Sequence, residues 1–138
     1  MWLDTTTNER ITLWREFRDK LEKSKTPFED VQELWNTAPR TTKGLDPWNS
    51  QQWNSPWELL AENRFCPVSI PLMMGWTMKL TTRFSQENIL IKTIVDHSNE
   101  RVYNVIHIQE TVLNVDNKVI NIRDVPSDWF TQFQTEIR

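Results

Sequence analysis

Residues 88–123 read NILIKTIVDHSNERVYNVIHIQETVLNVDNKVINIR. Between residues 101 and 108 successive side chains alternate between two faces, the period of a β-strand. Asp116-Asn117 is suited to a two-residue hairpin turn, although glycine is more common at the second position. Three further segments are rich in Ile, Leu and Val and flank such turns: 88–95, 111–115 and 118–123. The stretch therefore predicts an antiparallel meander of strands.

The chain before this meander has the period and the start signals of helices. Thr6 and Glu9 form a capping box ahead of apolar residues at helical spacing. The sequences TPFE at 26–29 and SPWE at 55–58 each place a capping residue before a proline and a glutamate, which predicts two more helix starts. A fourth helix is predicted from Pro71 to about Thr82, because Pro71 cannot donate to the carbonyl of Pro67.

After the meander, Ser127 is predicted to cap a last helix. Phe130, Phe133 and Ile137 would then lie on one face of it. The elements are segregated along the chain, which favours an α+β class. We predict one domain over residues 1–138, with N-terminal helices packed on a C-terminal antiparallel meander sheet and a final helix.

Composition argues against several classes of function. The net charge is −3 and no block of Lys or Arg could follow a phosphate backbone, so we expect no nucleic-acid partner. Two glycines leave no glycine-rich phosphate loop. Two histidines and one cysteine, without metal-ligand spacing, predict no metal site and no cofactor. The N-terminus lacks a signal-peptide pattern and no apolar run could span a bilayer, so we expect a protein that is neither secreted nor membrane-bound.

Three of the eight tryptophans, Trp48, Trp53 and Trp57, fall within ten residues. If they are exposed, their flat faces could bind a small ligand or a partner protein. If they are buried, they form a satellite core that anchors a long loop. The length of the loop favours the satellite core, and ligand binding through these residues remains an alternative.

Cys66, the sole cysteine, precedes the apolar fourth helix. A catalytic cysteine needs a stabilised thiolate and a nearby base. The Asp116-Asn117 turn sets a register in which His107 faces Pro126 and Asp124 lies one diagonal step away on the same face. The other interpretation is a cysteine that packs as a small buried apolar residue.

A cysteine before a helix, followed by a hairpin that carries His and Asp, resembles the element order of transglutaminase-like and papain-like thiol enzymes. The resemblance covers roughly residues 64–124. It implies an enzyme that acts on an acyl group, with Cys66 as nucleophile, His107 as base and Asp124 as the residue that orients the base.

A second resemblance extends over about two thirds of the chain. It rests on Asp46-Pro47-Trp48, Trp53, the run from Pro56 to Asn63, Phe65-Cys66-Pro67, and the opening residues Met1–Asp4 and Lys23–Pro27. These stretches are similar to a small protein family of large marine tailed phages that has no established activity. It implies a source in a phage, and a place in the host cytoplasm or the virion.

The absence of a clear catalytic motif, together with this resemblance, gives the leading expectation. It is a non-enzymatic phage structural, assembly or host-interaction protein that acts through contacts with a phage or host protein. The cysteine enzyme and the tryptophan-based ligand binder are the alternatives. The sequence does not define an oligomeric state.

Overall fold

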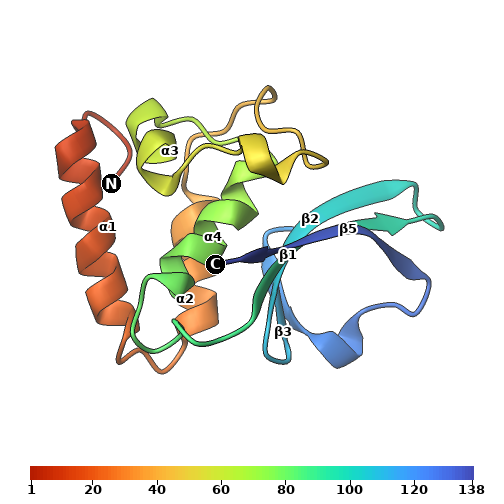
Figure 1. Cartoon of the computed structure of the whole chain (residues 1–138). Coiled ribbons are helices and arrows are strands. Elements are labelled where there is room, and N and C mark those ends of the chain that lie inside the picture. The colour runs from red at the N-terminus through yellow and green to blue at the C-terminus, as the bar shows by residue number, and fades with distance from the viewer.

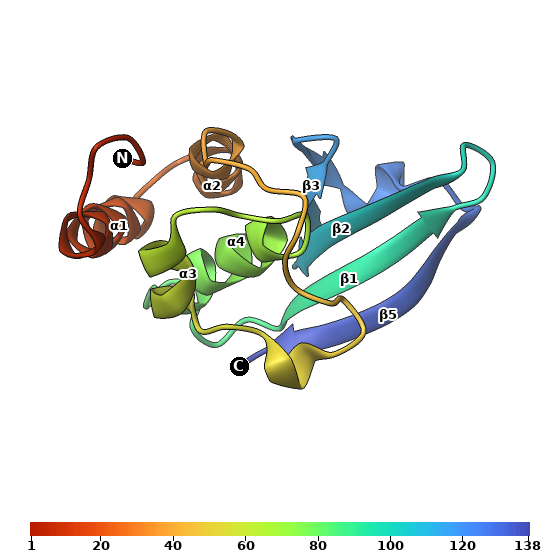
Figure 2. The ribbon, with the colours of Figure 1, turned by 90° about the horizontal axis from the view of Figure 1, so that it is seen from above.

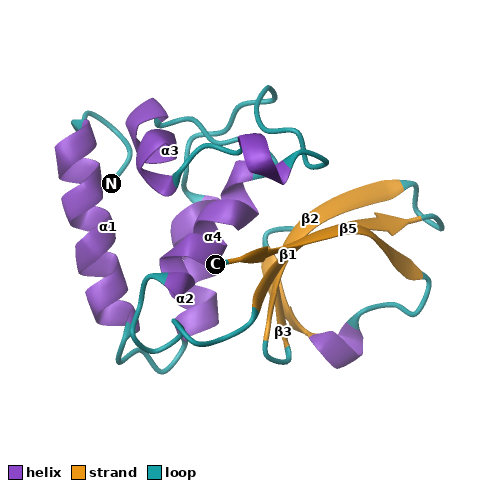
Figure 3. Cartoon of the chain, in the orientation of Figure 1, coloured by secondary structure: helices purple, strands orange, loops and turns teal.

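The computed structural model describes all residues, 1–138, and places the helices on one side and the sheet on the other (Figures 1 and 3). The predicted α+β class and the antiparallel sheet are confirmed. The elements follow in the order α1 (Thr7–Leu21), α2 (Pro27–Asn36), η1 (Ser50–Gln52), α3 (Pro56–Glu62), α4 (Ser69–Lys79), β1 (Ile89–Asp96), β2 (Arg101–Ile108), β3 (Thr111–Val115), β4 (Lys118–Asn121), η2 (Ile122–Asp124) and β5 (Trp129–Ile137).

Local sequence sets the helix starts. The Thr6 side chain accepts the backbone N–H of Glu9 at α1, and Ser55 and Glu58 make a complete capping box at α3. Helix α4 begins at Ser69, two residues before the predicted start. Pro71 therefore lies in the first turn, where a missing N–H leaves no helical hydrogen bond unmade.

The sheet has five strands in the order β4-β3-β2-β1-β5, and every pair is antiparallel. Strands β1 to β4 form the predicted meander, and Asp116 and Asn117 take the positive φ values of their turn. The last segment is wrong as a helix. Residues 129–137 form strand β5, which pairs with β1 from Ile89↔Ile137 to Asp96↔Trp129. Pairing with an open sheet edge outweighed the helical spacing of the three apolar residues.

Helix α4 is the centre of the fold, because it contacts the other three helices as well as β1, β2 and β5 (Figure 2). Around it lies a cluster of 23 buried apolar residues. Trp14 and Trp35 both donate their indole N–H to the Thr77 hydroxyl, at 2.9 and 3.1 Å. That hydroxyl in turn donates to the Met73 carbonyl at 2.6 Å. This arrangement joins α1 and α2 to α4.

The two faces of the sheet have different neighbours. On β2, Ile106 and Ile108 pack into the helical core, whereas Tyr103 and Val105 belong to a separate cluster of five buried residues on the outer face. Val125 and Trp129 pack against this outer cluster. Residues of even number on β2 therefore face the helices, and residues of odd number face away from them.

No helix of the structure is long and apolar enough to cross a membrane.

Candidate functional site

Cys66 lies at the amino end of α4 and takes part in the helix start. Its Sγ accepts the backbone N–H of Ser69 at 3.3 Å, and the Ser69 hydroxyl accepts the backbone N–H of Cys66 at 2.7 Å. Ile70 donates its N–H to the Cys66 carbonyl at 3.2 Å, which is the first helical bond. The pair has the reciprocal geometry of a capping box, with the thiol in the place of the capping hydroxyl.

A second backbone donor reaches the thiol from the loop that follows α2. Leu45 donates its N–H to Cys66 Sγ at 3.3 Å. Gly44 lies directly against the cysteine, and a Cβ at that position would fall well inside van der Waals contact with Cys66 Cβ and Sγ. The close approach of this loop therefore requires glycine at position 44.

These contacts determine the acidity of the thiol. Burial raises the pKa of Cys66, but the hydrogen bonds from Ser69, Leu45 and Val68 outweigh it, so the pKa is lowered from its ordinary value. Donors aimed at sulfur stabilise the thiolate more than the thiol, and the start of a helix adds a positive potential. Only 4% of the residue is exposed. The hydrogen bonds therefore favour the thiolate form of Cys66, and the 44–45 loop covers its sulfur.

Three cavities lie around this cysteine. The first, the thiol cavity, has a volume of about 490 Å³ and is lined by Cys66, Ser69 and residues of the 41–45 loop. The second, of about 390 Å³, lies beside it, because Thr41 lines both and the neighbours of the cysteine, Phe65 and Pro67, line the second. The third, of about 580 Å³, shares Asn54 with the thiol cavity.

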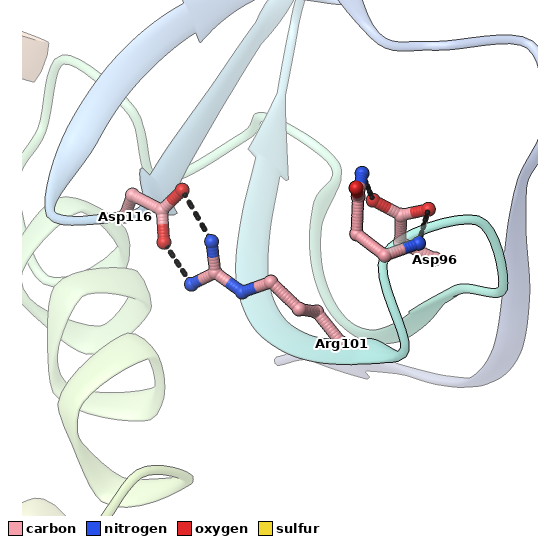
Figure 4. A network of polar contacts seen from close by, with 4 residues as sticks. Asp96, Arg101 and Asp116 are labelled. Atoms are coloured by element: carbon pink, nitrogen blue, oxygen red, sulfur yellow. Dashed lines mark hydrogen bonds and ion pairs between the residues drawn. The ribbon is translucent and has the colours of Figure 1, made fainter.

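An ion pair dominates the second cavity. Arg101, the first residue of β2, places both guanidinium nitrogens against the carboxylate of Asp116 in the β3–β4 turn (Figure 4). This hydrogen bond raises the pKa of Arg101, which therefore stays charged. Asp96 nearby bonds to Asn99 and does not take part in the pair. The cavity thus offers a fixed cation with further N–H donors.

The predicted triad is not assembled. His107 has an odd number on β2 and lies on the outer face, where its Nδ1 is 2.9 Å from Lys92 Nζ. Asp124 belongs to η2 and makes no side-chain hydrogen bond to the histidine. The assumed register explains the error: Val115 does pair with Lys118, but His107 pairs with Val112 and Leu90 instead of facing Pro126.

No histidine hydrogen-bonds to the thiol. Burial and the nearby Lys92 lower the pKa of His107, which favours its neutral form. His97, the other histidine, lies exposed in the turn between β1 and β2. The hydrogen bonds that reach the Cys66 sulfur therefore come from the start of α4 and from the 44–45 loop, and not from a histidine.

The three loop tryptophans are placed differently from one another. Trp53 packs against the main core and donates its indole N–H to the Asp46 carbonyl at 2.7 Å. Trp57 is 45% exposed and rests edge-on against Trp14, with ring centroids 5.4 Å apart. Trp48 is 51% exposed and lies over Phe133 of β5. The satellite core that we predicted therefore includes Trp53 but not Trp48.

Sequence reasoning missed the residues that surround the thiol. Ser69 and Gly44 were not recognised, because cysteine is not among the usual N-cap residues and serine is not the usual partner three residues later. Arg101 and Asp116 were not recognised either, since they meet only when the hairpin folds back. Leu45 contacts the Cys66 sulfur through its backbone N–H, so the identity of its side chain does not indicate this contact.

No family model and no curated protein matches the sequence. Among solved structures the fold is similar to Legionella pneumophila LapG. One structure of it gives a TM-score of 0.68 at 19% identity, over 94% of this chain and 75% of LapG. The calcium-bound form gives 0.71 at 16% identity, over 96% and 77%. The EGTA-treated form gives 0.67 at 18%, over 94% and 73%.

This similarity corrects the leading expectation. LapG is a calcium-dependent cysteine protease of transglutaminase-like fold. The prediction of a non-enzymatic phage structural, assembly or host-interaction protein is therefore contradicted, and the findings favour the alternative of a cysteine enzyme. Calcium is named for one of these structures, but no group of three or more His, Cys, Asp or Glu side chains in this chain is placed to hold a metal ion.

Proposed function

We propose that this chain is a cysteine enzyme that acts on an acyl group, with Cys66 as its nucleophile. The observation that carries the proposal is the pair of backbone N–H groups, from Leu45 and Ser69, that meet at Cys66 Sγ. Such donors at a helix start are a known means of stabilising a thiolate. The similarity of the fold to that of LapG supports the proposal.

In the proposed reaction the Cys66 thiolate attacks the carbonyl carbon of the substrate. A carbon–sulfur bond forms while the carbonyl electron pair moves to oxygen. When that pair returns, the bond to the leaving group breaks, and the leaving group departs with its electron pair and takes a proton from water. The hydroxide left by that water then attacks the thioester carbonyl, which releases the carboxylic acid and restores the Cys66 thiolate.

The surroundings of Cys66 assign roles to two further features. The 44–45 loop covers Sγ, so it has to move aside before a carbonyl carbon can reach the sulfur. Once it has moved, the Leu45 N–H is a candidate donor to the developing oxyanion. Arg101, held by Asp116 in the adjacent cavity, can donate to a substrate carbonyl or carboxylate with the N–H groups that the ion pair leaves free.

The direct test is to trap the acyl-enzyme. The protein is incubated with an acyl thioester of N-acetylcysteamine, a small substrate whose leaving group does not depend on an acid catalyst, and its intact mass is measured. We expect one added acyl group on Cys66, located by peptide mapping, and none in Cys66→Ala. His107→Gln is the matched control and should acylate at the rate of the parent. No adduct on a folded parent protein, or acylation that requires His107, would contradict the proposal.

A further inference from the structure

The largest of the three cavities is lined by tryptophans. Trp53, Trp57 and Trp76 surround a volume of about 580 Å³ together with Pro56, Leu72 and the end of β5. We call it the tryptophan pocket. Its volume lies in the range of ligand pockets, and its lining joins a loop, two helices and a strand.

Two indole N–H groups at this pocket have no partner in the protein. Trp2, Trp14, Trp35 and Trp53 all donate their indole N–H to an oxygen. Trp57 and Trp76 line the pocket and make no such bond. Trp57 is 45% exposed, and the indole nitrogen of Trp76 is not among the buried atoms that lack a partner. The two donors are therefore free for a ligand.

Some polar groups of the rim are engaged within the chain. The Glu58 carboxylate accepts the backbone N–H of Ser55 at 3.0 Å, and the Asn54 amide donates to Glu62 at 2.9 Å. Three other polar side chains of the lining make no hydrogen bond within the chain: Ser50, Gln51 and Thr135. Most of the exposed lining is nevertheless apolar, and the flat faces of the indoles suit an aromatic group next to a carbonyl.

The position of the pocket relates it to Cys66. Asn54 lines both the tryptophan pocket and the thiol cavity, and its hydrogen bond to Glu62 fixes it between the two. A substrate that occupies both cavities would pass Asn54.

We infer that the tryptophan pocket binds an aromatic side chain of the acyl substrate and thereby selects which acyl group reaches Cys66. The inference rests on the proposed function. The ring stacks on Trp57 and Trp53, and the substrate backbone carbonyl accepts an indole N–H.

Binding is tested without any reaction by NMR of the ¹⁵N-labelled indole groups. The probes are N-acetylphenylalaninamide, N-acetylalaninamide and methyl glucoside. We expect the phenylalanine probe to shift the signals of Trp57 and Trp76 and to leave those of Trp14 and Trp35 unchanged. Trp57→Leu, which keeps apolar contact with Trp14, should abolish the shifts, and Trp48→Ala should retain them. Shifts from methyl glucoside alone, or from none of the probes, would overturn the inference.

Selection is tested by alkylation of Cys66. The rate constants of chloroacetyl-phenylalaninamide and chloroacetamide are compared at one pH. We expect the aromatic reagent to react about tenfold faster, a factor that one good contact supplies. In Trp57→Leu this ratio should fall toward one, whereas Trp48→Ala should keep it. An equal rate for both reagents in the parent protein would overturn the inference. Slow alkylation by both, with the NMR shifts intact, would instead contradict the proposed function and leave the pocket as a binding site.

Discussion

The two faces of the sheet carry the two groups that sequence reasoning had joined in one site. The helix-covered face packs into a cluster of 23 buried residues, and Cys66 belongs to it. The outer face has a cluster of five, and His107 lies beside it with Lys92. Side chains of a strand alternate between faces, so a residue of odd number on β2 cannot reach a helix that covers the even ones. The pairing register of the strands therefore determines which side chains lie on one face and can take part in the same reaction.

The largest expected effect lies in the helix-covered core. Trp35 is fully buried and is one of the two indoles bound to Thr77. Replacing it with alanine should lower the free energy of unfolding by about 3–5 kcal/mol, the usual range for emptying a buried aromatic site. Chemical denaturation measures the change. A loss below about 1 kcal/mol would show that this face is not the main core.

A smaller loss is expected when the hydroxyl between the two indoles is removed. Thr77→Val keeps the shape but leaves the N–H groups of Trp14 and Trp35 without an acceptor. Each unpaired buried donor costs roughly 1–3 kcal/mol. Thr81→Val is the matched control, since the buried Thr81 hydroxyl accepts one N–H, that of Phe84, instead of two, and its loss should cost less. An equal loss in the free energy of unfolding for the two substitutions would mean that the Thr77 hydroxyl adds no stability by accepting both indoles.

On the outer face, the environment of His107 should make the free energy of unfolding depend on pH. Burial and Lys92 lower the pKa of His107 in the folded protein, so the unfolded chain binds the proton more readily. Stability should therefore be greatest above the unfolded pKa of about 6.5 and should fall as the pH drops through it toward the folded pKa. Denaturation curves between pH 7.5 and pH 5.5 would show this loss, and His107→Gln should reduce it. A pH dependence that is unchanged in the variant would place the effect elsewhere.

The smallest effect is expected at the exposed tryptophan. Trp48 is 51% exposed and only covers Phe133. Trp48→Ala should change the free energy of unfolding by no more than about 0.5 kcal/mol. The melting temperature checks this, with Trp35→Ala as the reference for a buried tryptophan. A loss as large as that of the reference would mean that the 46–54 loop is part of the core.

The comparison also shows what the sequence could predict. Strong local signals gave the helix starts after Thr6 and Ser55, the alternation of 101–108 and the Asp116-Asn117 turn, and the structure confirms each. Of the caps, only Ser55 and Glu58 make a complete capping box, and Thr26 makes no side-chain cap bond. The helix predicted at 127–137 failed because apolar residues at Phe130, Phe133 and Ile137 fit a helical face as well as a strand. The choice depended on the free edge of β1, a partner far away in the chain.

The candidate site was predictable only in part. Cys66 was found because a lone cysteine before a helix is a visible signal. Its partners were not, because both hydrogen bonds that reach the sulfur come from backbone N–H groups, those of Leu45 and Ser69, and the Arg101–Asp116 pair forms across a hairpin. The register of the β3–β4 hairpin was extended to His107, which lies on β2 and pairs with Val112 and Leu90, so the histidine was given a role on the wrong face.

The central claim is that hydrogen bonds from the start of α4 and from the 44–45 loop, and not a histidine, activate Cys66. It is tested most directly by the pH dependence of alkylation with iodoacetamide, followed for the parent, His107→Gln and Ser69→Ala. The account predicts a midpoint below that of glutathione, unchanged in His107→Gln and raised in Ser69→Ala, which loses the side-chain hydrogen bond at the start of α4. A midpoint at or above that of glutathione, or one that shifts in His107→Gln and not in Ser69→Ala, would contradict it.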